Sequence, residues 1–198
     1  MNDRRSRHLQ LSRWLSLAGA LLLSTGLSGA RGEPQENRTE RYSALAVSVE
    51  SPNESGSIPI TIIIDRFTTD AEMKSYAETF RTGGVGKLRR RLENVKVGRV
   101  APSGRVGIDV AIAREVDTAA GRTIRLVTAR HMSFLELRRG ERSTDYPFSW
   151  VELTLDKEGR GQGTAFLAFK PKFTKDDTLE IESLGNQPLR LLNVRRER

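Results

Sequence analysis

The sequence predicts an α+β domain that is mainly antiparallel β, with about nine strands in a curved sheet or partly closed barrel and one helical segment at about residues 69–94. Three observations lead to this prediction. Apolar residues recur with period two along most of the chain, turn residues separate these runs at short intervals, and only one segment has helical spacing. Strands joined by short turns form antiparallel meanders, so this pattern favours a barrel or sandwich over an α/β fold.

The first thirty residues have the pattern of a secretory signal peptide. Four arginines precede an apolar run from Trp14 to Leu27, and Ser28-Gly29-Ala30 supplies the small residues of a cleavage site. A membrane anchor is the rival interpretation, but polar residues and glycines interrupt the run, whereas a span needs about 20 apolar residues. We therefore expect cleavage near Ala30 and a secreted or periplasmic location.

The rest of the chain is expected to form one domain with a short tether before it. Residues 31–41 contain no apolar residue that could anchor them, which is typical of a flexible segment. Residues 42–198 are a suitable length for a single β-rich domain.

Composition excludes several classes of site. The sequence has no cysteine, so the chain can form no disulfide, thiolate metal site or thiol nucleophile. Its net charge of +8 would fall to +5 on loss of residues 1–30, which contain four Arg and one Asp. The remaining bases are mostly spread singly, which indicates a solvated face. Binding of an anionic envelope component is the alternative, and nucleic acid is disfavoured for an exported protein.

The first strands are predicted from alternation. Leu45, Val47 and Val49 alternate with small or polar residues, and after a Pro-Asn-Gly-containing turn the isoleucines at 58, 60, 62 and 64 share one face. Pro59 cannot donate a ladder hydrogen bond and is expected at the strand start or on an edge.

The helical segment begins with a capping box and is interrupted by glycines. Thr69 and Glu72 have the capping-box spacing, and an apolar face follows at helical intervals. Gly83-Gly84 ends this helix. A second short helix is expected after it, with its leucines inward and the bases of Lys87–Arg91 outward.

The segments after Asn94 return to period two. We expect strands around Val95–Val100, Val106–Ile112, Ile124–Thr128 and Phe148–Leu155, followed by strands around 164–169, 179–181 and 189–194.

Two glycine-rich segments resemble nucleotide-binding loops without meeting their requirements. Gly83–Leu88 is the first of these segments. The spacing of a phosphate-binding loop would require its first glycine at position 81, where Arg81 stands, and the hydroxyl that holds magnesium is replaced by Leu88. Gly159–Gly163 joins two strands and opens no helix, so we interpret it as a hairpin with a bulge. No nucleotide, cofactor or metal is therefore predicted.

The strand at Phe148 is the main candidate for a binding site. One of its faces is plainly apolar, whereas the other carries Phe148, Trp150 and Glu152. In a barrel this second face could line a cavity, with Trp150 stacking on a ligand and Glu152 accepting a hydrogen bond. The alternative is that Phe148 and Trp150 pack under the helix, with Glu152 at the sheet margin.

The loop before this strand supplies the remaining candidates, His131, Asp145 and Tyr146. His131 is the sole histidine after the leader, and it could join Asp145 and Glu152 in a hydrolase. No nucleophile-elbow pattern surrounds any serine, so we name no catalytic residue.

Ile64-Asp65-Arg66-Phe67, Ser133-Phe134, Thr144–Phe148 and Val151–Asp156 together resemble a family of uncharacterised secreted bacterial proteins, over most of the chain after the leader. The resemblance implies export and a common fold, and it supplies no activity, cofactor or catalytic residue.

The sequence therefore predicts a non-catalytic exported binding or accessory protein for an apolar or amphiphilic ligand or an envelope partner. The alternatives are the hydrolase and a structural or inhibitory module without a pocket.

Overall fold

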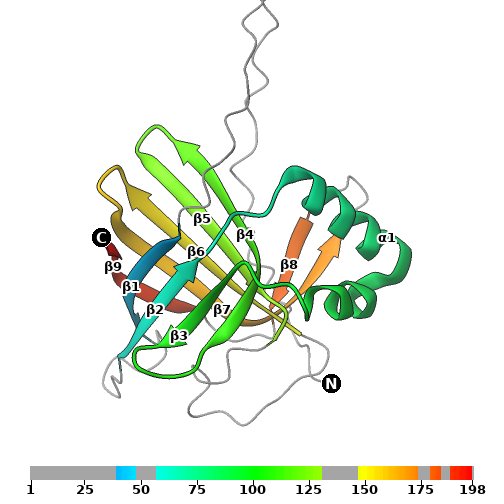
Figure 1. Ribbon diagram of the computed structural model, residues 1–198, viewed down its shortest axis with the longest axis horizontal. Coiled ribbons are helices and arrows are strands. Elements are labelled where there is room, and N and C mark those ends of the chain that lie inside the picture. Colours follow the sequence, from blue (N-terminus) through cyan, green and yellow to red (C-terminus); the bar gives the residue numbers. More distant parts are fainter. Residues whose placement is uncertain (1–38, 48–56, 131–146, 174–178, 184–187, 198) are drawn as a thin grey trace, which may run out of the picture. The chain divides into compact units, whose positions relative to one another are not determined.

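The computed structural model describes residues 39–47, 57–130, 147–173, 179–183 and 188–197 (Figure 1). The elements in this part of the chain are β1 (Glu40–Val47), β2 (Ile58–Ile64), α1 (Asp70–Leu92), β3 (Gly98–Pro102), β4 (Ile108–Thr118), β5 (Gly121–Thr128), β6 (Phe148–Asp156), β7 (Arg160–Phe173), β8 (Leu179–Ser183) and β9 (Leu189–Glu197). All recorded strand pairs are antiparallel. The predicted fold class is confirmed.

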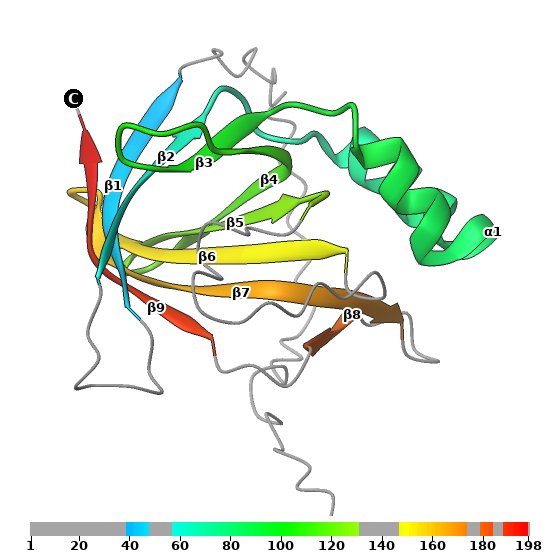
Figure 2. The same ribbon diagram turned by 90° about the horizontal axis from the view of Figure 1, so that it is seen from below.

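Eight of these strands form a closed barrel (Figure 2). Strands β1 to β7 follow one another around the ring, and β9 closes it by pairing with β7 on one side and β1 on the other. Strand β8 lies outside the ring and pairs with the second half of β7, from Phe169 to Phe173. The ring is therefore complete, where the sequence left open a curved sheet or partial closure.

The barrel interior is filled by apolar side chains at alternate strand positions. The isoleucines at 60, 62 and 64 of β2 are at most 1% exposed, and Val151, Leu153 and Leu155 of β6 are at most 3% exposed. Residues from β1, β3, β4, β5, β7 and β9 complete the same cluster. Each fully buried aliphatic side chain stabilises the fold by about 1.5–3 kcal/mol relative to an exposed one. The interior of this barrel is therefore a packed core.

A bulge in β4 changes which side chains enter this core. Val110 pairs with Thr128 and Ile112 pairs with Val127, so β4 has one extra residue between these pairs. As a result Ala113 joins the barrel core, whereas Ile112 packs on the helix side. The prediction of one strand face from Val106 to Ile112 is wrong, and Val106, at 91% exposed, lies before β4 begins.

A charged network lies where β1 begins. Glu40 is only 8% exposed, and its carboxylate accepts hydrogen bonds from Tyr42, Arg122 and Arg196, each at 2.7 Å. Arg122 also donates to the Tyr42 hydroxyl and to Glu115. Burial, followed by the hydrogen bond to Glu40, raises the pKa of Tyr42 far above its usual range. The barrel thus begins at Glu40, two residues before the predicted start of the domain.

The helix α1 consists of two helical pieces joined at a kink. Its N-terminus is the predicted capping box, in which Thr69 accepts from the Glu72 N–H and Glu72 accepts from the Thr69 N–H. Gly84, with φ +64° and ψ −167°, interrupts the helix where the sequence predicted a stop. None of the described helices is long and apolar enough to span a membrane.

Candidate functional site

The two faces of β6 point to different sides of the barrel wall. Val151, Leu153 and Leu155 project into the core, so Trp150, Glu152 and Thr154 project outward. The face that the sequence singled out therefore lies on the outside of the barrel and lines no interior cavity.

Phe148 and Trp150 belong to the cluster that joins the barrel to α1. Phe148 is 1% exposed, and its ring centroid is 5.7 Å from that of Phe169. Trp150 is half-buried and meets Phe169 edge to face at 6.1 Å. The same cluster contains Tyr76, Leu88 and Leu92 of the helix. The sequence offered packing against the helix as an alternative to lining a cavity. Phe148 is fully buried in this packing, whereas Trp150 is only partly buried.

Glu152 lies further along the same outer face. One of its carboxylate oxygens accepts a hydrogen bond from Arg125 Nε on β5 at 2.8 Å, and both side chains are partly solvent-exposed. The other predicted site residues, His131, Asp145 and Tyr146, lie outside the described residues.

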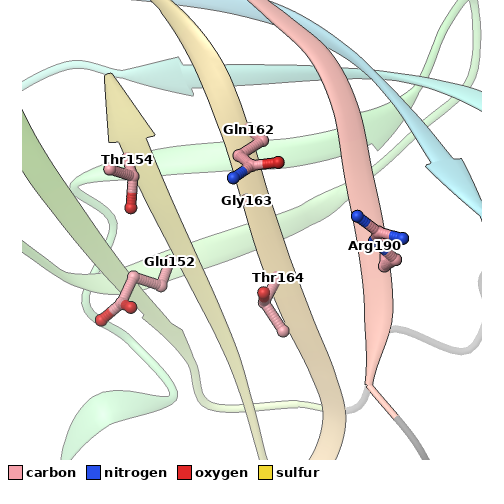
Figure 3. A pocket seen from close by; sticks show the side chains of 6 residues that line it. All are labelled: Glu152, Thr154, Gln162, Gly163, Thr164 and Arg190. Carbon is pink, nitrogen blue, oxygen red and sulfur yellow. The ribbon is translucent and has the colours of Figure 1, made fainter. Parts of the chain in front are cut away.

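A polar hollow lies on the outer wall, with Glu152 at one side of it (Figure 3). We call it the outer groove. Its volume of about 190 Å³ is smaller than the roughly 300–1,000 Å³ of pockets that enclose drug-sized ligands, so it can hold a single small chemical unit. It is lined by Glu152 and Thr154 of β6, Gln162, Gly163 and Thr164 of β7, and Arg190 of β9.

Strand register aligns these side chains in rows across the wall. Glu152 pairs with Arg125 on one side and Thr164 on the other, and Thr164 pairs with Arg190. Thr154 pairs with Gln162 in the next row. Directly opposite side chains have Cβ atoms about 4.5–5.5 Å apart, so neighbouring groups can contact one ligand together.

Four of the lining side chains have hydrogen-bonding capacity that the described part of the protein does not use. In that part of the chain the side chains of Thr154, Gln162, Thr164 and Arg190 form no recorded hydrogen bond or ion pair. They combine hydroxyl, amide and guanidinium groups, so donors and acceptors lie together beside the Glu152 carboxylate. No three His, Cys, Asp or Glu side chains among the described residues gather closely enough to hold a metal ion.

The sequence did not identify Gln162, Thr164 or Arg190 as site residues. The alternation of Gln162, Thr164 and Phe166 around the buried Ala165 is visible in the sequence and indicates a shared outer face. However, their position beside Glu152 and Arg190 depends on the register of β6, β7 and β9, which the sequence does not specify.

Comparison of the chain with protein-family models, with curated proteins and with solved structures gave no match. The resemblance to a family of secreted bacterial proteins therefore stays a prediction.

Proposed function

We propose that this protein is a non-catalytic exported binding or accessory protein, and that the outer groove is its binding surface. The observation that carries the proposal is the set of hydrogen-bonding side chains in the groove that have no partner among the described residues, namely Thr154, Gln162, Thr164 and Arg190. These groups face solvent from strands of a closed barrel, a rigid support that suits binding.

The chemistry of the outer groove favours a polar ligand. Apolar residues fill the barrel interior, so the described structure supplies no internal site for the apolar ligand that the sequence allowed. The groove instead presents carboxylate, amide, hydroxyl and guanidinium groups. Of the predicted partner classes, an envelope partner fits this polar lining best.

Binding also accounts for Glu152 better than catalysis does. Its ion pair with Arg125 holds the carboxylate in one orientation, which suits a hydrogen-bond acceptor. The hydrolase alternative requires His131 and Asp145, which lie outside the described residues. None of the described residues that line the groove is a histidine that could activate the hydroxyl of Thr154 or Thr164.

Methyl NMR of threonine-labelled full-length protein tests the proposal. On addition of a detergent-free extract of bacterial cell envelope, we expect saturable shifts of the Thr154 and Thr164 methyl signals. Thr61 is the matched control, because it faces outward from β2 on a distant part of the ring. The Arg190→Ala variant should weaken the response, whereas Arg195→Ala on the same strand should not. Absence of shifts at Thr154 and Thr164, or equal shifts at Thr61, would contradict the proposal.

A further inference from the structure

The outer groove also indicates which chemical class it binds, and this inference rests on the proposed function. Its lining combines donors and acceptors: Gln162 offers both, the two threonine hydroxyls offer both, and Arg190 only donates. Glu152 uses one oxygen for Arg125 and leaves the other available to accept. A ligand that satisfies such a mixed set must itself carry groups that both donate and accept, and the hydroxyl is the simplest of these.

Anions and extended peptides fit the groove less well. Arg190 is the single cation among the described residues that line the groove, and the neighbouring cation Arg125 is neutralised by Glu152. A phosphate at this place would meet one guanidinium and one carboxylate. A peptide that adds as a β-strand needs an open sheet edge. Along the groove β6 pairs with β5 and β7, and β7 pairs with β6 and β9, so no edge is open there.

An aromatic pair borders the groove on the same face. Trp150, two residues before Glu152 on β6, is the cross-strand partner of Phe166 on β7, and both rings are half-buried. Phe166 belongs to neither of the two apolar clusters that the described residues form. The edge contact of Trp150 with Phe169 fixes the orientation of the indole. A partly exposed, rigid aromatic surface is suited to stacking on a ring with an apolar face.

We propose that the outer groove binds a neutral carbohydrate. A pyranose ring has an apolar C–H face and an equatorial rim of hydroxyls, which are the two features that the aromatic pair and the groove complement. One sugar unit occupies the hollow, where Glu152, Gln162, Thr164 and Arg190 bond its hydroxyls. A neighbouring unit of the chain lies over Trp150 and Phe166.

Tryptophan fluorescence gives a direct test, because the chain contains only Trp14 and Trp150. In the full chain carrying Trp14→Phe, emission reports on Trp150 alone. Neutral hexasaccharides of glucose and of N-acetylglucosamine should shift this emission saturably for at least one of the two sugars. Gln162→Ala combined with Thr164→Ala should weaken binding at least tenfold, whereas Thr61→Ala should leave it unchanged.

The outcomes separate this inference from the proposed function. If the envelope extract shifts the Thr164 methyl but neither hexasaccharide changes Trp150 emission, the groove is a binding site for another class and the carbohydrate inference is wrong. Saturable binding of inorganic phosphate or of laurate that depends on Gln162 and Thr164 leads to the same conclusion. If neither the extract nor any probe produces a response, both proposals are wrong.

Discussion

Glu72 shows how one carboxylate fixes the start of the helix. It accepts two hydrogen bonds from the Arg66 guanidinium, at 2.9 and 3.0 Å, and one from the Thr69 N–H at 2.8 Å. The bonds from Arg66, followed by the backbone bond from Thr69, lower the pKa of Glu72 from its ordinary 4.5 to about 2. This side chain therefore joins the segment after β2 to the first turn of α1 in its charged form.

We predict that Glu72 makes stability depend on pH between about 4.5 and 2. Because its pKa is lower in the folded chain than in the unfolded chain, its stabilisation is complete above the unfolded pKa and is lost as pH falls through the folded one. Glu72→Gln keeps a capping-box residue, so the deficit of this variant in free energy of unfolding should be largest near pH 6 and vanish near pH 2. Carbon-13 NMR of the carboxyl group and denaturation at each pH measure both quantities.

Glu78→Gln is the control for this prediction. Glu78 is exposed on the same helix and its side chain forms no ion pair with another described residue, so its loss should change stability little at pH 6. A Glu72 titration midpoint near 4.5 would contradict the expected effect of Arg66.

At the scale of the element, α1 is a folded-back pair of short helices. Arg91 in the second piece donates to the Ser75 hydroxyl at 2.7 Å and to Thr79 in the first, and its guanidinium lies 5.3 Å from the centre of the Tyr76 ring. These contacts span the kink at Gly84. The two pieces therefore face the barrel together, with Tyr76, Leu88 and Leu92 buried against it.

Two glycines of this element should respond in opposite directions to alanine. Gly84 has backbone angles that only glycine adopts readily, although no atom lies within 4 Å of a Cβ placed there. Gly84→Ala should therefore destabilise the fold by about 1–3 kcal/mol through strain. Gly86 is exposed, and its added Cβ would lie in ordinary contact, 3.8 Å from Arg90. Gly86→Ala should stabilise by about 0.5–1 kcal/mol. Chemical denaturation of the two variants measures both changes in the free energy of unfolding. Equal changes in the two variants would contradict the kink at Gly84.

At the scale of the whole molecule, periodicity predicted the elements but not their arrangement around the ring. Features that depend on local spacing could be predicted from the sequence. They are the isoleucines of β2, the capping box at Thr69 and the helix stop at Gly84. The outward direction of Trp150 and Glu152 could not be predicted, because a strand with two different faces can place either face inside the barrel. Closure through β1 and β9 brings together residues from the two ends of the domain, and local patterns contain no signal for that pairing.

The same dependence on strand pairing explains why the sequence identified only part of the candidate site. Glu152 was selected as a carboxylate beside an aromatic residue, and the structure places it in the outer groove. Arg190, almost forty residues away, enters the groove only because β9 pairs with β7. The bulge in β4 likewise reverses the side on which Ile112 lies, by a single extra residue.

Closure of the ring leads to a prediction about hydrogen exchange. In an open nine-stranded sheet the first and last strands would be edges, and their outward amides would exchange quickly. In the closed barrel β1 pairs with both β2 and β9. Its amides should therefore be protected from exchange to the same degree as those of β5, which lies between β4 and β6.

Strand β8 supplies the internal comparison, since its recorded pairing is with β7 alone, outside the ring. Peptides from β8 should exchange faster than peptides from β1 and β9 in native-state exchange followed by mass spectrometry. Local opening of a strand that is paired on one side only breaks far fewer contacts than opening of a closed ring. The difference in exchange rate should therefore persist well below the unfolding temperature. Exchange of β1 and β9 at the rate of β8 would mean that the seam between them opens independently, and the barrel would then behave in solution as a curved sheet.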